Sequence, residues 1–321
     1  MSCPHATTHT PIHSLNAAHH ADPWAFYRTA CARPGLHFDT ASAQWMAADA
    51  ATVRALLAHP GLGVRPPDEP VPRALLGRPF GAVYARWLRM RDDAGHAAEK
   101  AALNAALARW TDAQIRRHAE AASRLAASGG PRHWQWASLP CSIAGLLGLA
   151  LPDLAAQRRL LRQLASWAAA FKPGATPAEL DAADAAVAEL GQLDAQLDAQ
   201  LDAQQLALLW QGYEAGAGLL GNAWLAGTAP DGQPPPVHHT RRFAQAELRL
   251  AGATLARGAC VLLLLVAEPA LGFGHGRHQC PGRELAMQIA SIALRHAPAR
   301  PPQLAAACLP LPNVRIPELS L

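Results

Sequence analysis

The sequence predicts a mainly α-helical protein, a single helical domain with a small β-sheet. Half of the 321 residues are hydrophobic and only 16% are charged, and the apolar residues are mostly Ala and Leu, which favour helices. Helical patterns cover much of the chain and are densest over residues 178–227. Short runs of β-forming residues occur within residues 237–266, and they predict a small sheet beside the helices.

The two ends of the predicted domain differ in composition. Residues 1–20 have no apolar stretch, so we expect a flexible tail over 1–20 and one globular domain over 21–321. Incidental metal binding by this tail stays open as an alternative. Residues 63–81 are rich in Pro and Gly and predict a long ordered loop, a feature that often carries function. The tail histidines are His5, His9, His13, His19 and His20.

Composition also argues against several classes of protein. The net charge is +4, and no cluster of Lys and Arg with interleaved aromatic residues predicts nucleic-acid binding. The longest apolar run, residues 259–267, has nine residues, whereas a membrane-spanning helix needs about 20. No secretory leader is visible, and the six cysteines form no CxxC pair. A reduced, cytoplasmic location is therefore the expectation.

A glycine-rich loop with one cysteine carries the most specific chemistry. Residues 272–282 read Gly-Phe-Gly-His-Gly-Arg-His-Gln-Cys-Pro-Gly and lead into an apolar helix. A thiolate at a helix N-terminus is stabilised by the macrodipole and by free N–H groups, so we expect a lowered pKa for Cys280 and good donation to a metal. Phe273 can shield the sulfur, and the glycines let the backbone approach a flat ligand. Two alternatives are an inert structural cysteine and a zinc site from His275, His278 and Cys280, which lacks a fourth ligand.

Five positions of this loop match the pattern Phe-x-x-Gly-x-His/Arg-x-Cys-x-Gly, and the segment resembles the haem-binding loop of the cytochrome P-450 family. The matching positions are Phe273, Gly276, His278, Cys280 and Gly282. The resemblance implies that Cys280 is the axial ligand of iron and that the cofactor is haem b. The cofactor-binding residues implied in this loop are Phe273, Gly274, His278, Cys280 and Gly282.

Two further segments resemble propionate-binding parts of the same family. Residues 90–100 are similar to a helix with His-x-x-x-Arg, and here the pair is His96 and Lys100. Lys keeps the charge but loses the bidentate fork of Arg. Residues 235–244 are similar to a strand that sends one arginine to a propionate, which implies Arg242. The alternatives are a plain helix-surface pair and a surface strand whose arginines bind carboxylates.

The sequence departs from the family in ways that bear on activity. The oxygen-binding helix normally has Ala-Gly-x-Asp/Glu-Thr, and this chain retains the acid as Glu214 but has Ala215 in place of the alcohol. Both are candidate catalytic positions, and loss of a positioned proton relay costs about 10²–10⁴-fold in rate. No Glu-x-x-Arg motif occurs, and only residues 268–271 stand where a long meander is normal. We therefore expect the cytochrome P-450 fold, reduced by internal deletions, with weaker support for Cys280.

The resemblance implies an enzyme, a haem-thiolate monooxygenase (an oxidoreductase) that inserts one oxygen atom from O2 into a small or medium apolar substrate. Oxygen activation would be impaired or altered. The substrate would lie between the helix over 204–227, the loop near 65–84 and the strand 238–240. The implied partners are O2 and a ferredoxin-type donor docking on a basic patch, without nucleic acid or membrane, for a protein that acts as a monomer. Two alternatives are a degenerate, non-catalytic haem-binding protein and a peroxide-using haem enzyme. The residues of the basic patch are Lys100, Arg277 and Arg283.

Overall fold

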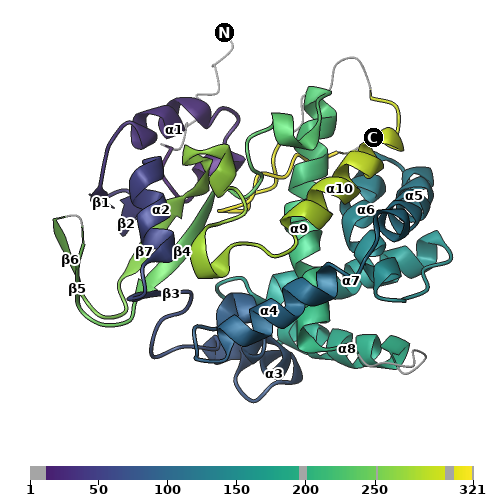
Figure 1. The fold of residues 1–321 in the computed structure, drawn as a ribbon, viewed down its shortest axis with the longest axis horizontal. Coiled ribbons are helices and arrows are strands. Elements are labelled where there is room, and N and C mark those ends of the chain that lie inside the picture. Colours follow the sequence, from purple (N-terminus) through teal and green to yellow (C-terminus); the bar gives the residue numbers. More distant parts are fainter. Residues whose placement is uncertain (1–11, 195–200, 251, 301–306, 320–321) are drawn as a thin grey trace, which may run out of the picture.

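The structure is a computed structural model, and it describes residues 12–194, 201–250, 252–300 and 307–319. A helical body and a small sheet lie side by side, and the long helix α9 runs through the middle of the molecule (Figure 1). The α-helices of the described residues are α1 (Trp24–Cys31), α2 (Ala50–Ala58), α3 (Pro79–Ala85), α4 (His96–Leu107), α5 (Asp112–Ser128), α6 (Pro131–Leu146), α7 (Leu154–Ala170), α8 (Pro177–Asp194), α9 (Ala203–Ala226) and α10 (Arg283–Arg295).

The main sheet has five strands in the order β1-β2-β7-β4-β3, and β5 and β6 form a separate hairpin. Only the β2–β7 pair is parallel, and the others are antiparallel. Helices α1 and α2 lie beside this sheet (Figure 1). The mainly α architecture with a small sheet is therefore confirmed. The strands are β1 (Leu36–Asp39), β2 (Gln44–Ala47), β3 (Leu62–Gly63), β4 (His239–Ala244), β5 (Leu248–Leu250), β6 (Ala253–Leu255) and β7 (Cys260–Leu264).

A capping box begins helix α9, and glycines on this helix allow close packing against α6. The Asp202 carboxylate accepts a hydrogen bond from the Gln205 amide, and the Gln205 side-chain oxygen accepts one from the Asp202 amide. This capping box begins the helix. A Cβ added at Gly212 or Gly216 would lie 2.6 or 3.0 Å from the Leu139 side chain of α6. The glycines therefore allow α6 to approach closely, which offsets their cost of roughly 1 kcal/mol each in a helix interior.

The expected internal deletions are confirmed. Only one short 3-10 turn, η4 (Pro230–Gly232), separates the end of α9 from the start of β4. Two such turns, η5 (Leu265–Ala267) and η6 (Pro269–Leu271), separate β7 from the cysteine loop. Within the described ranges, no helix combines the length and the apolarity that crossing a membrane requires.

The prediction of a flexible tail over residues 1–20 is wrong for residues 12–20, and residues 1–11 lie outside the described part of the chain. Ser14, Ala17 and Ala18 have no exposed surface. The Ser14 hydroxyl donates to Asp39 Oδ2 at 2.7 Å, and Ala17 packs in an apolar cluster with Tyr27. Small side chains let this polar-looking segment bury itself, which its composition did not indicate.

Buried histidines make the stability of this fold depend on pH. Burial, with help from Arg315, lowers the pKa of His238 to about 3, and the ring shares a 2.7 Å hydrogen bond with the Tyr27 hydroxyl. An unfolded histidine titrates near 6.5, so between these values only the unfolded chain takes up the proton. We expect the free energy of unfolding to fall as the pH drops below about 6.5, with a slope of up to about 1.4 kcal/mol per pH unit from this group. Urea titrations across this range should give a shallower slope for His238→Gln, and an unchanged slope would contradict the assignment.

Candidate active site

The cysteine loop lies between β7 and the start of α10. The Cys280 amide donates to the Phe273 carbonyl at 2.8 Å and closes the loop. The Gly282 amide donates to the Cys280 sulfur, and Gly282 is the residue before the first turn of α10. Arg283 stacks over the Phe273 ring at 5.7 Å. The backbone thus presents one partly buried sulfur at the mouth of the helix.

Helix α2 supports this loop from one side. Gly276 has φ +69°, and a Cβ there would lie 3.1 Å from the Cα of Ala58 at the end of α2. Only glycine combines this backbone conformation with so close an approach. The conformation of the loop is therefore fixed by a helix far away in the sequence.

Asp92, which the sequence analysis did not select, connects three parts of the site. Its Oδ1 accepts from His278 Nε2 at 2.8 Å, and its Oδ2 accepts from the Val64 amide at 2.7 Å. Arg277 lies 3.7 Å from the same carboxylate. Burial alone would raise the pKa of Asp92, but these hydrogen bonds lower it below its usual value. The only sequence signal was its place in the segment 90–100.

The helix pair His96 and Lys100 lies at the cysteine loop. The Lys100 ammonium donates to the Gln279 carbonyl at 2.8 Å and also to the Arg277 carbonyl. Lys100 is therefore hydrogen-bonded to the cysteine loop in this structure, and its contact with a propionate stays a prediction. His96 is 3% exposed, and its ring meets the His278 ring edge-on at 4.6 Å.

The expectation of a lowered pKa for Cys280 is wrong for the sulfur as it stands in this structure. Burial raises the pKa of the thiol, and this outweighs the opposite effects of the Gly282 amide, Arg89 and Lys100. The Gly282 amide ahead of α10 stabilises a thiolate less than the loss of hydration on burial destabilises it. A metal bound here must therefore displace a proton from sulfur.

Arg242 is a buried cation with an unused donor. It is 5% exposed on β4, and its Nη1 donates to the Arg241 carbonyl at 2.9 Å. Its Nε is buried without a partner, and no carboxylate among the described residues forms an ion pair with it. Burial lowers its pKa to about 10, partly opposed by Asp92. An unpaired buried charge is costly, so a bound anion would stabilise Arg242.

Helix α9 brings Glu214 and Ala215 to the other side of the site. Burial raises the pKa of the Glu214 carboxyl, although Lys172 and Arg89 oppose the shift. Arg89 interacts electrostatically with both Cys280 and Glu214. Because Arg89 is within electrostatic range of both groups, the Cys280 sulfur and the Glu214 carboxyl lie in the same region of the protein.

We infer that this space is a hollow. Many protein atoms surround Arg89, yet the residue is exposed. This combination indicates a side chain at the wall of an opening between the elements around it. Cys280 is likewise deeply placed but partly exposed.

These residues fit a haem. A single sulfur donor, a hollow beside it, and a buried arginine that lacks an anion are what a flat iron porphyrin with carboxylate arms requires. Among the described residues, no three His, Cys, Asp or Glu side chains are grouped to hold a metal ion. The zinc alternative therefore has no ligand set, and His278 bonds to Asp92 instead.

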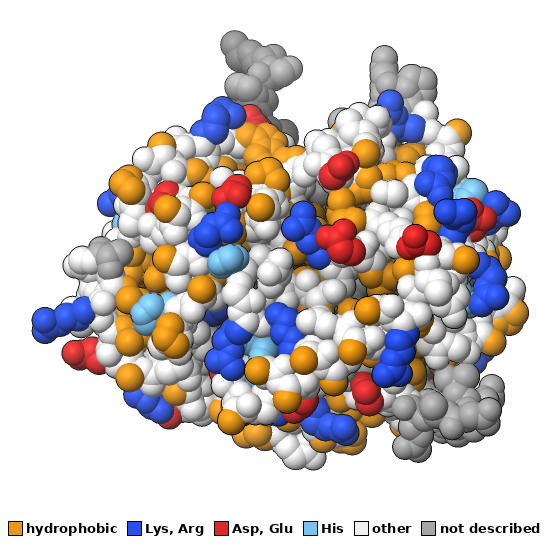
Figure 2. Space-filling view, viewed as in Figure 1, with side chains coloured by type: hydrophobic (Ala, Val, Ile, Leu, Met, Phe, Trp, Pro, Cys, Tyr) orange, Lys and Arg blue, Asp and Glu red, His pale blue; other side chains and the backbone are white. Residues whose placement is uncertain are grey.

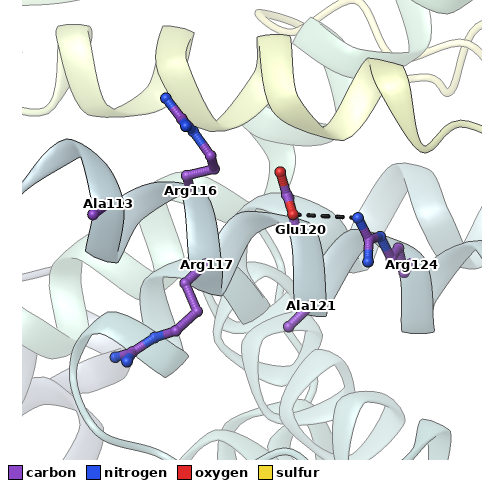
Figure 3. Close-up of a pocket in the computed structure, with 6 residues that line it drawn as sticks. All are labelled: Ala113, Arg116, Arg117, Glu120, Ala121 and Arg124. Carbon is purple, nitrogen blue, oxygen red and sulfur yellow. Dashed lines mark hydrogen bonds and ion pairs between the residues drawn. The ribbon is translucent and has the colours of Figure 1, made fainter.

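The outer surface holds a shallow groove and scattered charges. The groove runs along α5, where Arg124 pairs with Glu120 at 3.2 Å (Figure 3). All of its lining comes from this one helix, and no group in it resembles the cysteine site. Figure 2 shows Lys and Arg side chains, mixed with Asp and Glu, on the face where α4 and α10 lie. The groove is lined by Ala113, Arg116, Arg117, Glu120, Ala121 and Arg124.

Comparison with known proteins supports the fold. No protein-family model matches the chain, and no curated protein matches it. Solved structures do match over nearly the whole length. P450BioI, solved in complex with an acyl carrier protein ligated to hexadec-9Z-enoic acid, has a TM-score of 0.74 and 18% identity, with 92% of this chain and 97% of that chain covered.

Two more similar structures agree. Cytochrome P450epoK with bound epothilone D has a TM-score of 0.75 at 17% identity, covering 96% of this chain and 98% of that one. CYP109E1 from Bacillus megaterium with testosterone has a TM-score of 0.66 at 15% identity, covering 92% and 98%. The chain thus has the cytochrome P-450 fold, in a form that lacks the Glu-x-x-Arg helix and the meander.

Proposed function

We propose that this chain, which has the cytochrome P-450 fold, is a haem-thiolate monooxygenase that inserts one oxygen atom from O2 into a small or medium, largely apolar substrate in the cytoplasm. The observation that carries the proposal is the Cys280 sulfur at the edge of a hollow that Arg242, a cation without an anion, also serves. Haem b bound there would supply the redox chemistry, with the thiolate donating electron density to iron. Cys280 would hold the iron and Arg242 a propionate, beside His96, His278 and the loop residues Phe273, Gly274 and Gly282.

Glu214 is the proton-holding group of the proposed reaction. Because burial raises its pKa, its carboxyl keeps a proton at a higher pH than an exposed glutamate does. It can therefore release a proton inside the hollow. Ala215, the next residue, offers no hydroxyl to pass that proton on, which supports an altered oxygen activation.

Restoring the hydroxyl should improve coupling. We expect Ala215→Thr to raise the ratio of oxygenated product to released hydrogen peroxide by about tenfold or more, since a positioned proton donor contributes about 10²–10⁴-fold. The measurement is product and peroxide yield per NADPH with a surrogate ferredoxin and reductase. Ala215→Val has the same branching without the hydroxyl and should show no gain. Equal ratios in both variants would contradict a relay at this position.

A ferredoxin-type donor is proposed to dock beside the cysteine loop. Arg277 and Arg283 are both partly exposed there, and their near carboxylates, Asp92 and Glu284, lie 3.7 Å away. Arg277 also donates to the Asp92 carbonyl at 3.1 Å, and both side chains keep enough exposed surface to meet an acidic partner. Lys100 contributes less to such a patch than expected, because it is bound to loop carbonyls.

The deciding experiment is the absorption spectrum of the purified, reduced, CO-treated protein. A Soret band shifted strongly to the red, as thiolate ligation produces, is the expected result. An ordinary Soret position, or no haem uptake from added haemin, would overturn the proposal. Ala215 also favours a second candidate, a peroxide-using haem enzyme. That candidate would form product with hydrogen peroxide and no reductase, while retaining the shifted band.

A further inference from the structure

Arg89 is a second cation in the hollow that the proposed chemistry does not use. It lies in the turn η3 (Leu88–Met90) and is deep in the protein but exposed. Within the described part of the chain it forms no ion pair with a carboxylate, and its nearest ring contact is Trp210, at 5.8 Å from its Cζ. Its five N–H donors are therefore available to a ligand in the hollow.

The contact with Trp210 locates Arg89 on the α9 side. Trp210 lies four residues before Glu214 and so shares its helix face. Arg242, in contrast, is fixed on β4 and is influenced by Asp92, which binds the cysteine loop through His278. The two guanidinium groups come from different elements but lie within electrostatic range of each other. Arg89 is within range of the Cys280 sulfur as well as of Glu214, and its ring contact with Trp210 places it beside α9.

The charges around Arg89 leave it without compensation. Burial raises the pKa of the Glu214 carboxyl, so this group favours its neutral form. Tyr84, which also interacts with Arg89, has a raised pKa for the same reason. The neighbouring cation Arg65 already pairs with Glu69 at 3.3 Å. An unpaired guanidinium in this setting favours an anion, and most strongly a flat carboxylate that can accept two hydrogen bonds.

The surroundings also suit an apolar body attached to that anion. Trp210 stacks on Trp87 with ring centroids 4.9 Å apart, and Phe171 packs against Trp210 at 4.8 Å. The indole N–H groups of Trp87 and Trp210 are buried without an acceptor. Trp87 has no exposed surface, so Trp210 and Phe171, which are partly exposed, are the rings that can contact a ligand, and they carry no negative charge.

We propose that Arg89 is a specificity-determining residue that binds the carboxylate of the substrate, and that the substrate class is carboxylic acids with an apolar chain or ring. The inference rests on the proposed function, because it treats the bound acid as the substrate of that reaction. Oxygen would then be inserted into the apolar part of the acid, while Arg89 holds the carboxylate. A carboxylate arm of haem is the other anion that Arg89 could meet, and the experiment separates the two.

The test compares dodecanoic acid with dodecan-1-ol as probes, at neutral pH, on the full-length protein loaded with haem. Affinities are measured by equilibrium dialysis and by the shift of the Soret band. Wild-type protein should bind the acid more tightly than the alcohol. Arg89→Gln should weaken acid binding by about 10–100-fold, the loss of a charge-assisted pair, and leave alcohol binding within about twofold. Arg89→Lys should recover part of the loss. The matched control is Arg86→Gln, an exposed arginine three residues away.

The outcomes are distinguishable. Equal affinity for acid and alcohol in the wild type, or parallel losses for both in Arg89→Gln, would overturn the inference. A drop in haem content in Arg89→Gln with an unchanged acid-to-alcohol ratio would also overturn it and assign Arg89 to haem. Dialysis does not need a thiolate-ligated iron. Selective, Arg89-dependent acid binding without a red-shifted CO band would therefore uphold the inference while the monooxygenase proposal fails.

Discussion

Replacing Cys280 by serine is expected to abolish the red-shifted Soret band of the reduced, CO-treated protein. The sulfur is presented by a loop closed on the Phe273 carbonyl and is capped by the Gly282 amide, so no other side chain can take its place at the same point. A serine oxygen fits the same space, but it is a far weaker donor to iron. Haem uptake should fall, and any haem that is retained should give a band at the ordinary position.

The control for this variant is Cys31→Ser, a partly exposed free thiol on α1. It should bind haem and show the shifted band as the wild type does. If Cys280→Ser kept the shifted band, the iron ligand would be a different sulfur. If both variants lost it together, the effect would be one of folding, which the far-UV circular dichroism of the two proteins would reveal.

The cysteine loop could be predicted from sequence because its signal is local. Phe273, Gly276 and Cys280 lie within eight consecutive positions, and the loop closes with a hydrogen bond between its own residues. The long helix and the strand with Arg242 were predictable for a similar reason, since period and spacing are properties of contiguous residues. The same reasoning predicted the missing segments, since a deletion is visible as a short interval between two recognisable motifs.

Other features depend on contacts between distant parts of the chain and were not predictable. Asp92 meets His278 across an interval of 186 positions, and no pattern marks either partner for the other. The spacing of Lys100 from His96 does not indicate its hydrogen bond to the Gln279 carbonyl, which only the folded chain brings about. The raised pKa of the Cys280 thiol is not predictable from the loop, because burial is a property of the whole fold and outweighs the local amide.

These distant contacts also explain how the loop is held despite the deletions. The end of α2 packs against Gly276, Lys100 ties two loop carbonyls to α4, and Asp92 links His278 to the Val64 amide beside β3. All three supports come from the first third of the sequence, not from the segments that are missing. The chain thus retains a braced sulfur ligand, which argues against reading the short length as decay of the site.

Arg242→Met should have opposite effects on the empty and the haem-loaded protein. In the empty protein the guanidinium is buried with an unpaired Nε, so removing it should leave the free energy of unfolding unchanged or raise it by up to about 1 kcal/mol. In the loaded protein the same change removes a charge-assisted bond to a propionate, worth about 1.5–3 kcal/mol. Haem should then transfer to an excess of an acceptor apoprotein about 10–100-fold faster.

The neighbouring Arg241→Met is the matched control, because Arg241 is exposed on the same strand and pairs with Leu262 in register. It should change neither the stability of the empty protein nor the rate of haem transfer by more than about twofold. Urea unfolding of the empty proteins and stopped-flow haem transfer from the loaded ones provide the two readings. A purely structural role for Arg242 predicts a loss of stability in both forms, so equal destabilisation of empty and loaded protein would exclude it as a propionate ligand.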